Sequence, residues 1–228
     1  MTPFELIDWP CPATTGERHD ELALVFDRGR TQRVLVLPAW FDEANKLRRQ
    51  TVEVMRRLDL SGIDSALPDL PGCNESAAPL ADQTLQSWRE AARAAAEHFR
   101  ATHVLTIRAG ALLPPDGIPG WRYVPTSGAK VLRSMLRART IASREAGPAE
   151  RTEDLQALAR REGIELAGWR IGAEMFRELE EAEPATQLID IEQASVGGSG
   201  LWLRAEPDED PEQADALAAM IAIQLGGA

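Results

Sequence analysis

The nine residues from Val104 to Leu112 constrain the fold of this chain more than any other stretch. An apolar run ends abruptly at Arg108, Ala109 and Gly110 follow, and a second apolar run begins. This order is typical of a buried strand that turns sharply into a helix and presents one side chain at the turn. The pattern therefore predicts that Arg108 stands at the end of a central strand.

In α/β hydrolases the same turn carries the pattern G-x-S-x-G, whose serine is the nucleophile. Aligned on that pattern, Thr106 replaces the first glycine, Arg108 replaces the serine, and Gly110 matches the last glycine. A guanidinium stays protonated and cannot attack a carbonyl carbon. The segment thus indicates the scaffold of a hydrolase without its nucleophile.

Apolar runs alternate with helical patterns along the chain, which favours a parallel sheet with right-handed crossovers. The run from Arg33 to Pro38 has the continuous apolar character of a strand buried on both faces. We expect an α/β fold of three layers, with a mostly parallel sheet, helices on both faces and no sizeable cap domain. Expected strands are 4–8, 21–27, 33–38, 63–67, 102–107, 121–125, 186–191 and 201–203; expected helices are 42–58, 83–100, 128–143, 152–162, 170–182 and 211–225, with a mobile connection at 145–151.

Length and charge narrow the class of protein. The chain has 228 residues, 44% of them hydrophobic, which suits a single domain over 1–228. A net charge of -11 argues against nucleic acid or an anionic membrane as a partner. Cys11 and Cys73 make neither a disulfide framework nor a zinc site, so we expect no metal and no cofactor. The lack of an apolar run of membrane length predicts no membrane span and a cytoplasmic protein.

Four segments, taken together and in this order, resemble one bacterial family. They are Leu37–Arg49, Leu67–Ser76, Arg108–Leu112, and Val124–Lys130 with Leu136-Arg137; the region Gly200–Trp202 matches more loosely. The chain is similar to the α/β-hydrolase-like proteins associated with the exosortase system of exopolysaccharide-producing bacteria. This resemblance implies the α/β-hydrolase fold and a hydrolase label, and it does not by itself imply activity.

The histidines argue against Ser-His-Asp chemistry. A hydrolase of this fold needs nucleophile, acid and histidine in that chain order. His19, His98 and His103 all precede Arg108, and the chain carries no histidine after it. A serine without an imidazole as general base lacks its usual activation.

Two interpretations of Arg108 stay open. In the functional one, it binds a carboxylate or phosphate at the carboxyl edge of the sheet. In the structural one, it pairs with an acid such as Asp69 or Glu43 and fills the place of the lost site.

Other side chains near this edge are candidate site residues. Cys73 and Ser127 are the possible nucleophiles, with Asp69 or Glu43 as base; an inert buried thiol and an ordinary helix cap are the structural alternatives, and no histidine is expected near Cys73. Trp40 offers a stacking surface or simple packing. The candidate ligand-binding residues are Arg108, Trp40, Glu43, Asn45, Lys46 and Asn74.

The sequence therefore supports two functions of different classes. One is a catalytically degenerate protein that acts by binding a small molecule or protein, as an accessory factor in exopolysaccharide or exosortase systems. The other is an esterase-like or acyl-transfer hydrolase with a non-standard nucleophile. A homodimer formed through the proline-rich segment after Arg108 is a third possibility.

Overall fold

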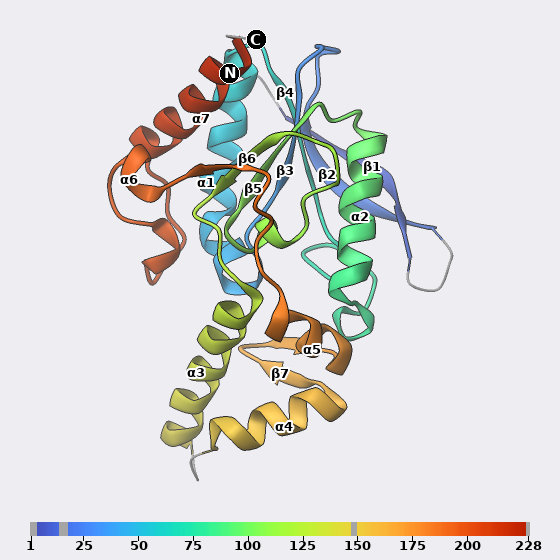
Figure 1. Ribbon diagram of the computed structural model, residues 1–228, viewed down its shortest axis with the longest axis vertical. Coiled ribbons are helices and arrows are strands. Elements are labelled where there is room, and N and C mark those ends of the chain that lie inside the picture. Colours follow the sequence, from blue (N-terminus) through green and yellow to red (C-terminus); the bar gives the residue numbers. More distant parts are fainter. Residues whose placement is uncertain (1–3, 14–17, 147–149, 227–228) are drawn as a thin grey trace.

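A mostly parallel sheet forms the centre of the computed structural model, which describes residues 4–13, 18–146 and 150–226. Within these residues the sheet has seven strands in the order β1-β2-β4-β3-β5-β6-β9 (Figure 1). β1 and β2 are antiparallel, β2 and β4 are antiparallel, and the other pairs are parallel. The strands are β1 (Glu5–Pro12), β2 (Arg18–Phe26), β3 (Arg33–Leu37), β4 (Asp64–Pro68), β5 (His103–Ile107), β6 (Gly120–Tyr123) and β9 (Ile189–Ile191).

Alternation along the central strands produces two hydrophobic layers. On β3, Leu35 and Leu37 belong to the layer under one face, whereas Val34 and Val36 belong to the layer under the other. Side chains alternate between the faces of a strand, so a continuous apolar run fills both layers at once. Helix α2 (Leu85–His98) covers the first face, and α1 (Phe41–Leu60) with α7 (Pro211–Gly226) covers the second (Figure 1). The predicted fold class is confirmed.

A small lobe lies beyond the carboxyl edge of the sheet, at the bottom of Figure 1. It consists of α3 (Gly128–Ala146), α4 (Thr152–Glu162), the antiparallel pair β7 (Ile164–Leu166) and β8 (Trp169–Ile171), and α5 (Ala173–Glu181). Its buried side chains continue the layer that α2 covers. The part of the chain that the structure describes has no larger cap over this edge, as the sequence predicts.

Several expected elements are placed differently. The expected strand 201–203 is wrong: it is the 3-10 helix η3 (Leu201–Leu203), because Trp202 turns back against the sheet edge and contacts Tyr123. The expected helix 170–182 begins only at Ala173, because the preceding residues pair as β8. The strand expected at 4–8 extends to Pro12, and the one expected at 186–191 shortens to its last three residues.

The remaining differences concern short elements and one connection. The expected connection 145–151 falls partly on 147–149, outside the described residues, and α3 continues to Ala146. Among the described helices, none is long and apolar enough to span a bilayer. The short helices are η1 (Leu80–Asp82), η2 (Arg108–Leu112) and α6 (Gln193–Val196).

The turn after β5 depends on a close backbone contact at Gly110. A β-carbon placed on Gly110 would lie 2.3 Å from the carbonyl oxygen of Leu37 and 2.7 Å from that of Pro38. Both neighbours are main-chain atoms at the end of β3, so they cannot move aside as a flexible side chain could. We expect Gly110→Ala to lower the free energy of unfolding by about 1–3 kcal/mol, the usual cost of forcing extra volume into a packed site. Urea unfolding measures this cost.

Gly226→Ala is the matched control, because a β-carbon on Gly226 meets no atom within 4 Å. Its unfolding free energy should change by no more than about 0.5 kcal/mol. Equal effects of the two substitutions would contradict the contact at Gly110.

Candidate functional site

Arg108 occupies a sharp turn at the carboxyl end of β5. Its φ of 54° lies in the left-handed region, which residues with a β-carbon seldom adopt. The 3-10 helix η2 starts at this residue and ends at Leu112, so the long helix usual after such a turn is absent here. Pro114 and Pro115 follow at once and account for this early end.

The guanidinium of Arg108 is held by three parts of the chain. Nε donates to Oε2 of Glu43 and Nη2 donates to Oε1, both at 3.0 Å, which makes a bidentate ion pair. Nη1 donates to the carbonyl oxygen of Val124 at 2.9 Å. The guanidinium carbon lies 4.3 Å from the ring centre of Trp202, within the range of a cation–π contact. Arg108 therefore pairs with Glu43, one of the two acids that the sequence left open, and its side chain is only 13% exposed.

The other acid, Asp69, organises a second polar group at the end of β4. Asn74 donates to Oδ1 of Asp69 at 2.6 Å, and Arg48 on α1 contacts the same oxygen at 3.3 Å. The second carboxylate oxygen of Asp69, Oδ2, is buried and has no hydrogen-bond partner. Asn74 adopts a φ of 50°, which brings its amide to the carboxylate.

Cys73 lies beside this group as a neutral thiol. Burial, followed by the charges of Asp69 and Glu21, raises the pKa of the Cys73 thiol to about 12. At neutral pH the thiolate, which is the nucleophilic form, is scarce. His19 on β2 lines a neighbouring pocket with Pro71, and the lining of that pocket does not include Cys73.

Aromatic side chains fill the space next to Cys73. Trp40 packs edge-to-face on Trp88 with ring centres 4.9 Å apart, and Phe41 packs on Trp169 at 5.5 Å. The slot that Trp40, Phe41, Cys73 and Trp169 share with their neighbours holds a cavity of about 30 Å³, the volume of one water molecule in the liquid. Trp40 thus serves packing here, although its indole Nε1 is buried without a partner.

The other predicted residues are not joined to these groups. Lys46 pairs with Asp42 one helical turn earlier, at 2.8 Å, and Asn45 is exposed on α1. Ser127 is buried next to the start of α3, where its carbonyl oxygen accepts from Lys130 and Val131. Within the described residues, no hydrogen bond links the Ser127 side chain to a carboxylate or an imidazole, and no group of three metal-ligating side chains occurs.

The structure adds partners that the sequence did not single out for this site. Trp202 and the carbonyl oxygen of Val124 contact Arg108, and Arg48 contacts Asp69. All three lie in segments that carry the family resemblance: Arg48 and Val124 in two of the four main segments, and Trp202 in the loosely matching region near Gly200.

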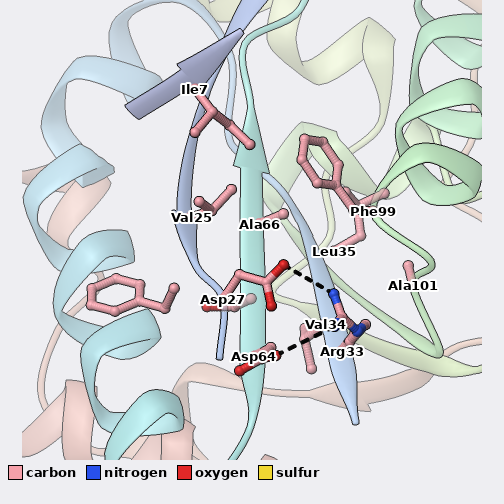
Figure 2. Close-up of a pocket in the computed structure, with 12 residues that line it drawn as sticks. Ile7, Val25, Asp27, Arg33, Val34, Leu35, Asp64, Ala66, Phe99 and Ala101 are labelled. Atoms are coloured by element: carbon pink, nitrogen blue, oxygen red, sulfur yellow. Dashed lines mark hydrogen bonds and ion pairs between the residues drawn. The ribbon is translucent and has the colours of Figure 1, made fainter. Parts of the chain in front are cut away.

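A pocket at the opposite end of the sheet is structural. Figure 2 shows Arg33 between Asp27 and Asp64, with ion-pair distances of 3.2 Å and 3.8 Å. A hydrogen bond from the backbone N–H of Gly29, followed by the contact with Arg33, holds the pKa of Asp27 below its ordinary value. The cavity measures about 30 Å³, so this cluster fixes the amino ends of the strands and leaves little room for a ligand.

Comparison with known proteins supports the fold. No protein-family model matches the chain, and no curated protein sequence matches it. Among solved structures, the chain is similar to a putative hydrolase from Agrobacterium vitis (15% identity, 99% of each chain covered, TM-score 0.51). It is also similar to mouse alpha/beta hydrolase domain-containing protein 10 (13% identity, 99% of each chain, TM-score 0.59). The esterase Est1E of Butyrivibrio proteoclasticus, solved with ferulic acid, matches at 12% identity over 91% of this chain and 95% of its own (TM-score 0.54). At these identities the likeness shows the α/β-hydrolase fold alone.

The Arg108–Glu43 pair should contribute measurably to stability. We expect a double-mutant cycle with Arg108→Met and Glu43→Gln to give a coupling free energy of about 1–2 kcal/mol, because the pair is bidentate and largely shielded from solvent. Thermal or urea unfolding of the four proteins measures it. The turn strain at position 108 is common to Arg and Met, so it cancels in the cycle.

The pair of Asp42 and Lys46 on the same helix is the control, because it is a single contact one helical turn apart whose carboxylate is 66% exposed. Its cycle, with Asp42→Asn and Lys46→Met, should give only about 0.3–0.5 kcal/mol. A coupling at Arg108 no larger than this control would refute the structural importance of the pair.

Proposed function

We propose that this chain is a non-hydrolytic protein of the α/β-hydrolase fold, which acts by binding as an accessory factor. Its partner systems are those of exopolysaccharide export and exosortase-dependent processing in bacteria, served from the cytoplasm. The observation that carries the proposal is the side chain at the turn after β5. There Arg108 occupies the place of a nucleophile and is paired with Glu43.

The contacts of Arg108 support a structural role for the side chain at the turn after β5, where a hydrolase carries its nucleophile. The guanidinium of Arg108 donates two hydrogen bonds to one carboxylate and lies over an aromatic ring, so its charge is satisfied without a ligand. To bind an external anion, Arg108 would have to leave Glu43 with an unpaired charge. Because Glu43 is largely shielded from solvent, that exchange is unfavourable.

The alternative nucleophiles have little support. The raised pKa keeps Cys73 in the thiol form, and the two neighbouring carboxylates oppose the thiolate further. Ser127 is buried, and the chain has no histidine after Arg108 to serve as its base. These facts disfavour the esterase-like alternative.

The form of the carboxyl edge favours a macromolecular partner over a small substrate. The slot beside Trp40 has the volume of one water molecule, whereas ligand pockets of enzymes measure several hundred cubic ångströms. Asn45 and Asn74 are exposed around this edge, and Glu43 and Lys46 are partly exposed there. We assign the contact with the partner to these side chains.

Loss of hydrolysis can be tested directly. A panel of short acyl esters should give no turnover above buffer, and a fluorophosphonate probe should label no serine. The variant Arg108→Ser should be equally silent, because a restored hydroxyl still lacks an imidazole to accept its proton. Iodoacetamide should react with Cys73 in the native protein at least about tenfold more slowly than in urea, since the thiol is protonated and buried.

Turnover accompanied by covalent labelling at one residue would overturn the proposal. Turnover without labelling, abolished by Cys73→Ala or Ser127→Ala, would do the same and would identify the nucleophile.

The pathway can be tested in the host. Deleting the gene should lower the export of polysaccharide and the processing of sorted surface proteins, both measured by immunoblot and sugar analysis. Complementation with the double variant Cys73→Ala, Ser127→Ala should restore both to the level of the wild-type chain, because neither side chain is used chemically. Unchanged export in the deletion strain would contradict the pathway; rescue by the wild type alone would contradict the non-hydrolytic role.

A further inference from the structure

A cavity of about 150 Å³ lies between the β1–β2 pair and the loop that follows β4. It shares no lining residue with the slot beside Trp40. A cavity of this volume accommodates a molecule the size of benzene, with about six non-hydrogen atoms. Its walls carry small apolar groups from Pro12, Ala13, Pro71, Ala77, Ala78 and Pro79.

Glu21 supplies a buried carboxylate to this cavity. The residue is only 3% exposed, it lines the cavity, and its oxygen Oε2 has no hydrogen-bond partner. The other oxygen, Oε1, accepts a hydrogen bond of 2.7 Å from the hydroxyl of Ser76. The carboxylate is therefore half satisfied, and a buried acceptor without a partner costs stability unless a ligand or water supplies the donor.

The hydrogen bonds around Ser76 fix the direction of this contact. Its oxygen Oγ accepts from the backbone N–H of Gly72 at 2.9 Å and from that of Ala78 at 3.1 Å. With both lone pairs in use, the hydroxyl proton points to Glu21. Glu21 thus acts as an acceptor toward Ser76, and its free oxygen is the acceptor that remains.

The charges nearby favour a cation over an anion. Asp82 lines the same cavity and carries a second carboxylate. The charge of Asp69 also repels the Glu21 carboxylate. His19 lies on the same face of β2 as Glu21, two residues away, and also lines the cavity. Among the lining residues that the structure describes, two carboxylates thus accompany a single imidazole.

We propose that this cavity binds a small organic ammonium ion, with the charged group on Oε2 of Glu21 and a short apolar tail against the proline and alanine walls. The ammonium donates a charge-assisted hydrogen bond to the free oxygen, and Asp82 attracts it at the rim. The tail replaces water over the apolar lining. This site is independent of the turn at Arg108 and of the proposed accessory role.

The probe is n-pentylammonium, and 1-pentanol is its neutral counterpart of the same size. Titration calorimetry near pH 8 should show that the ammonium binds at least about tenfold more tightly than the alcohol, because only the ammonium pairs with a charge. Glu21→Gln keeps the acceptor for Ser76 and removes the charge, so it should weaken ammonium binding about tenfold and leave pentanol unchanged. Asp82→Asn should weaken it by about two- to threefold, as expected for an exposed charge.

Glu5→Gln is the matched control, since Glu5 is an exposed carboxylate of β1 outside the cavity; it should change neither affinity. The pH dependence of ammonium binding by the wild-type protein is a second test that needs no variant. Burial raises the pKa of Glu21 above its ordinary value. The ammonium affinity of the wild-type protein should therefore fall as the pH is lowered from about pH 8, and it should fall at a higher pH than an ordinary glutamate would give, because Glu21 loses its charge.

Equal affinity for the ammonium and the alcohol, or no detectable ammonium binding, would overturn the site. Full binding by a folded Glu21→Gln variant would do so too. Should that variant unfold, as circular dichroism would reveal, an affinity of the wild-type protein independent of pH is the overturning result.

Discussion

The contact of Gly110 with the carbonyl oxygens at the end of β3 is the constraint on which the carboxyl edge depends. It brings the turn after β5 directly against the neighbouring strand and leaves no room for a β-carbon. The chain reaches this position only if the residue two places earlier, Arg108, takes a positive φ. Such a conformation costs about 1–3 kcal/mol, and hydrogen bonds of Arg108 to the Glu43 carboxylate, each about 1.5–3 kcal/mol, are of the size needed to offset it.

Backbone strain gathers at this edge of the sheet. Phe41 after β3, Arg108 after β5 and Val124 after β6 all have positive φ values, of 55°, 54° and 43°. Strained residues of this kind usually belong to sites where they position reacting groups. Here the strained residues have packing and hydrogen-bonding roles. Phe41 packs on Trp169, and the main-chain carbonyl oxygen of Val124 accepts a hydrogen bond from Arg108. These strained positions thus serve packing and the ion pair of Arg108 in this structure.

The sequence predicted the sheet and the turn but not the pairing of side chains around them. The run from Arg33 to Pro38 identifies a central strand because its apolar residues fill both layers. The helix predicted at 170–182 wrongly included the last residues of strand β8. The apolar residues from Ile171 to Leu179 have a helical spacing, and a strand of three residues is too short to interrupt that pattern. The choice between Glu43 and Asp69 as the partner of Arg108 depends on how far α1 leans over the sheet, which spacing along the chain does not encode.

Buried polar atoms show where this fold still has room for a ligand. Indole Nε1 of Trp40 and Oδ2 of Asp69 lack partners at the carboxyl edge, and Oε2 of Glu21 lacks one beside β1. Each costs about 1–3 kcal/mol, a considerable part of the 5–15 kcal/mol by which a domain of ordinary stability is folded. Trp40 borders only a slot of about 30 Å³, which its own aromatic neighbours close. Glu21 borders a cavity of about 150 Å³ that a ligand can enter. Aromatic packing and one ion pair thus fill the space beside Trp40 and Arg108, whereas the unpartnered oxygen of Glu21 belongs to a residue that lines a larger cavity on the antiparallel strands.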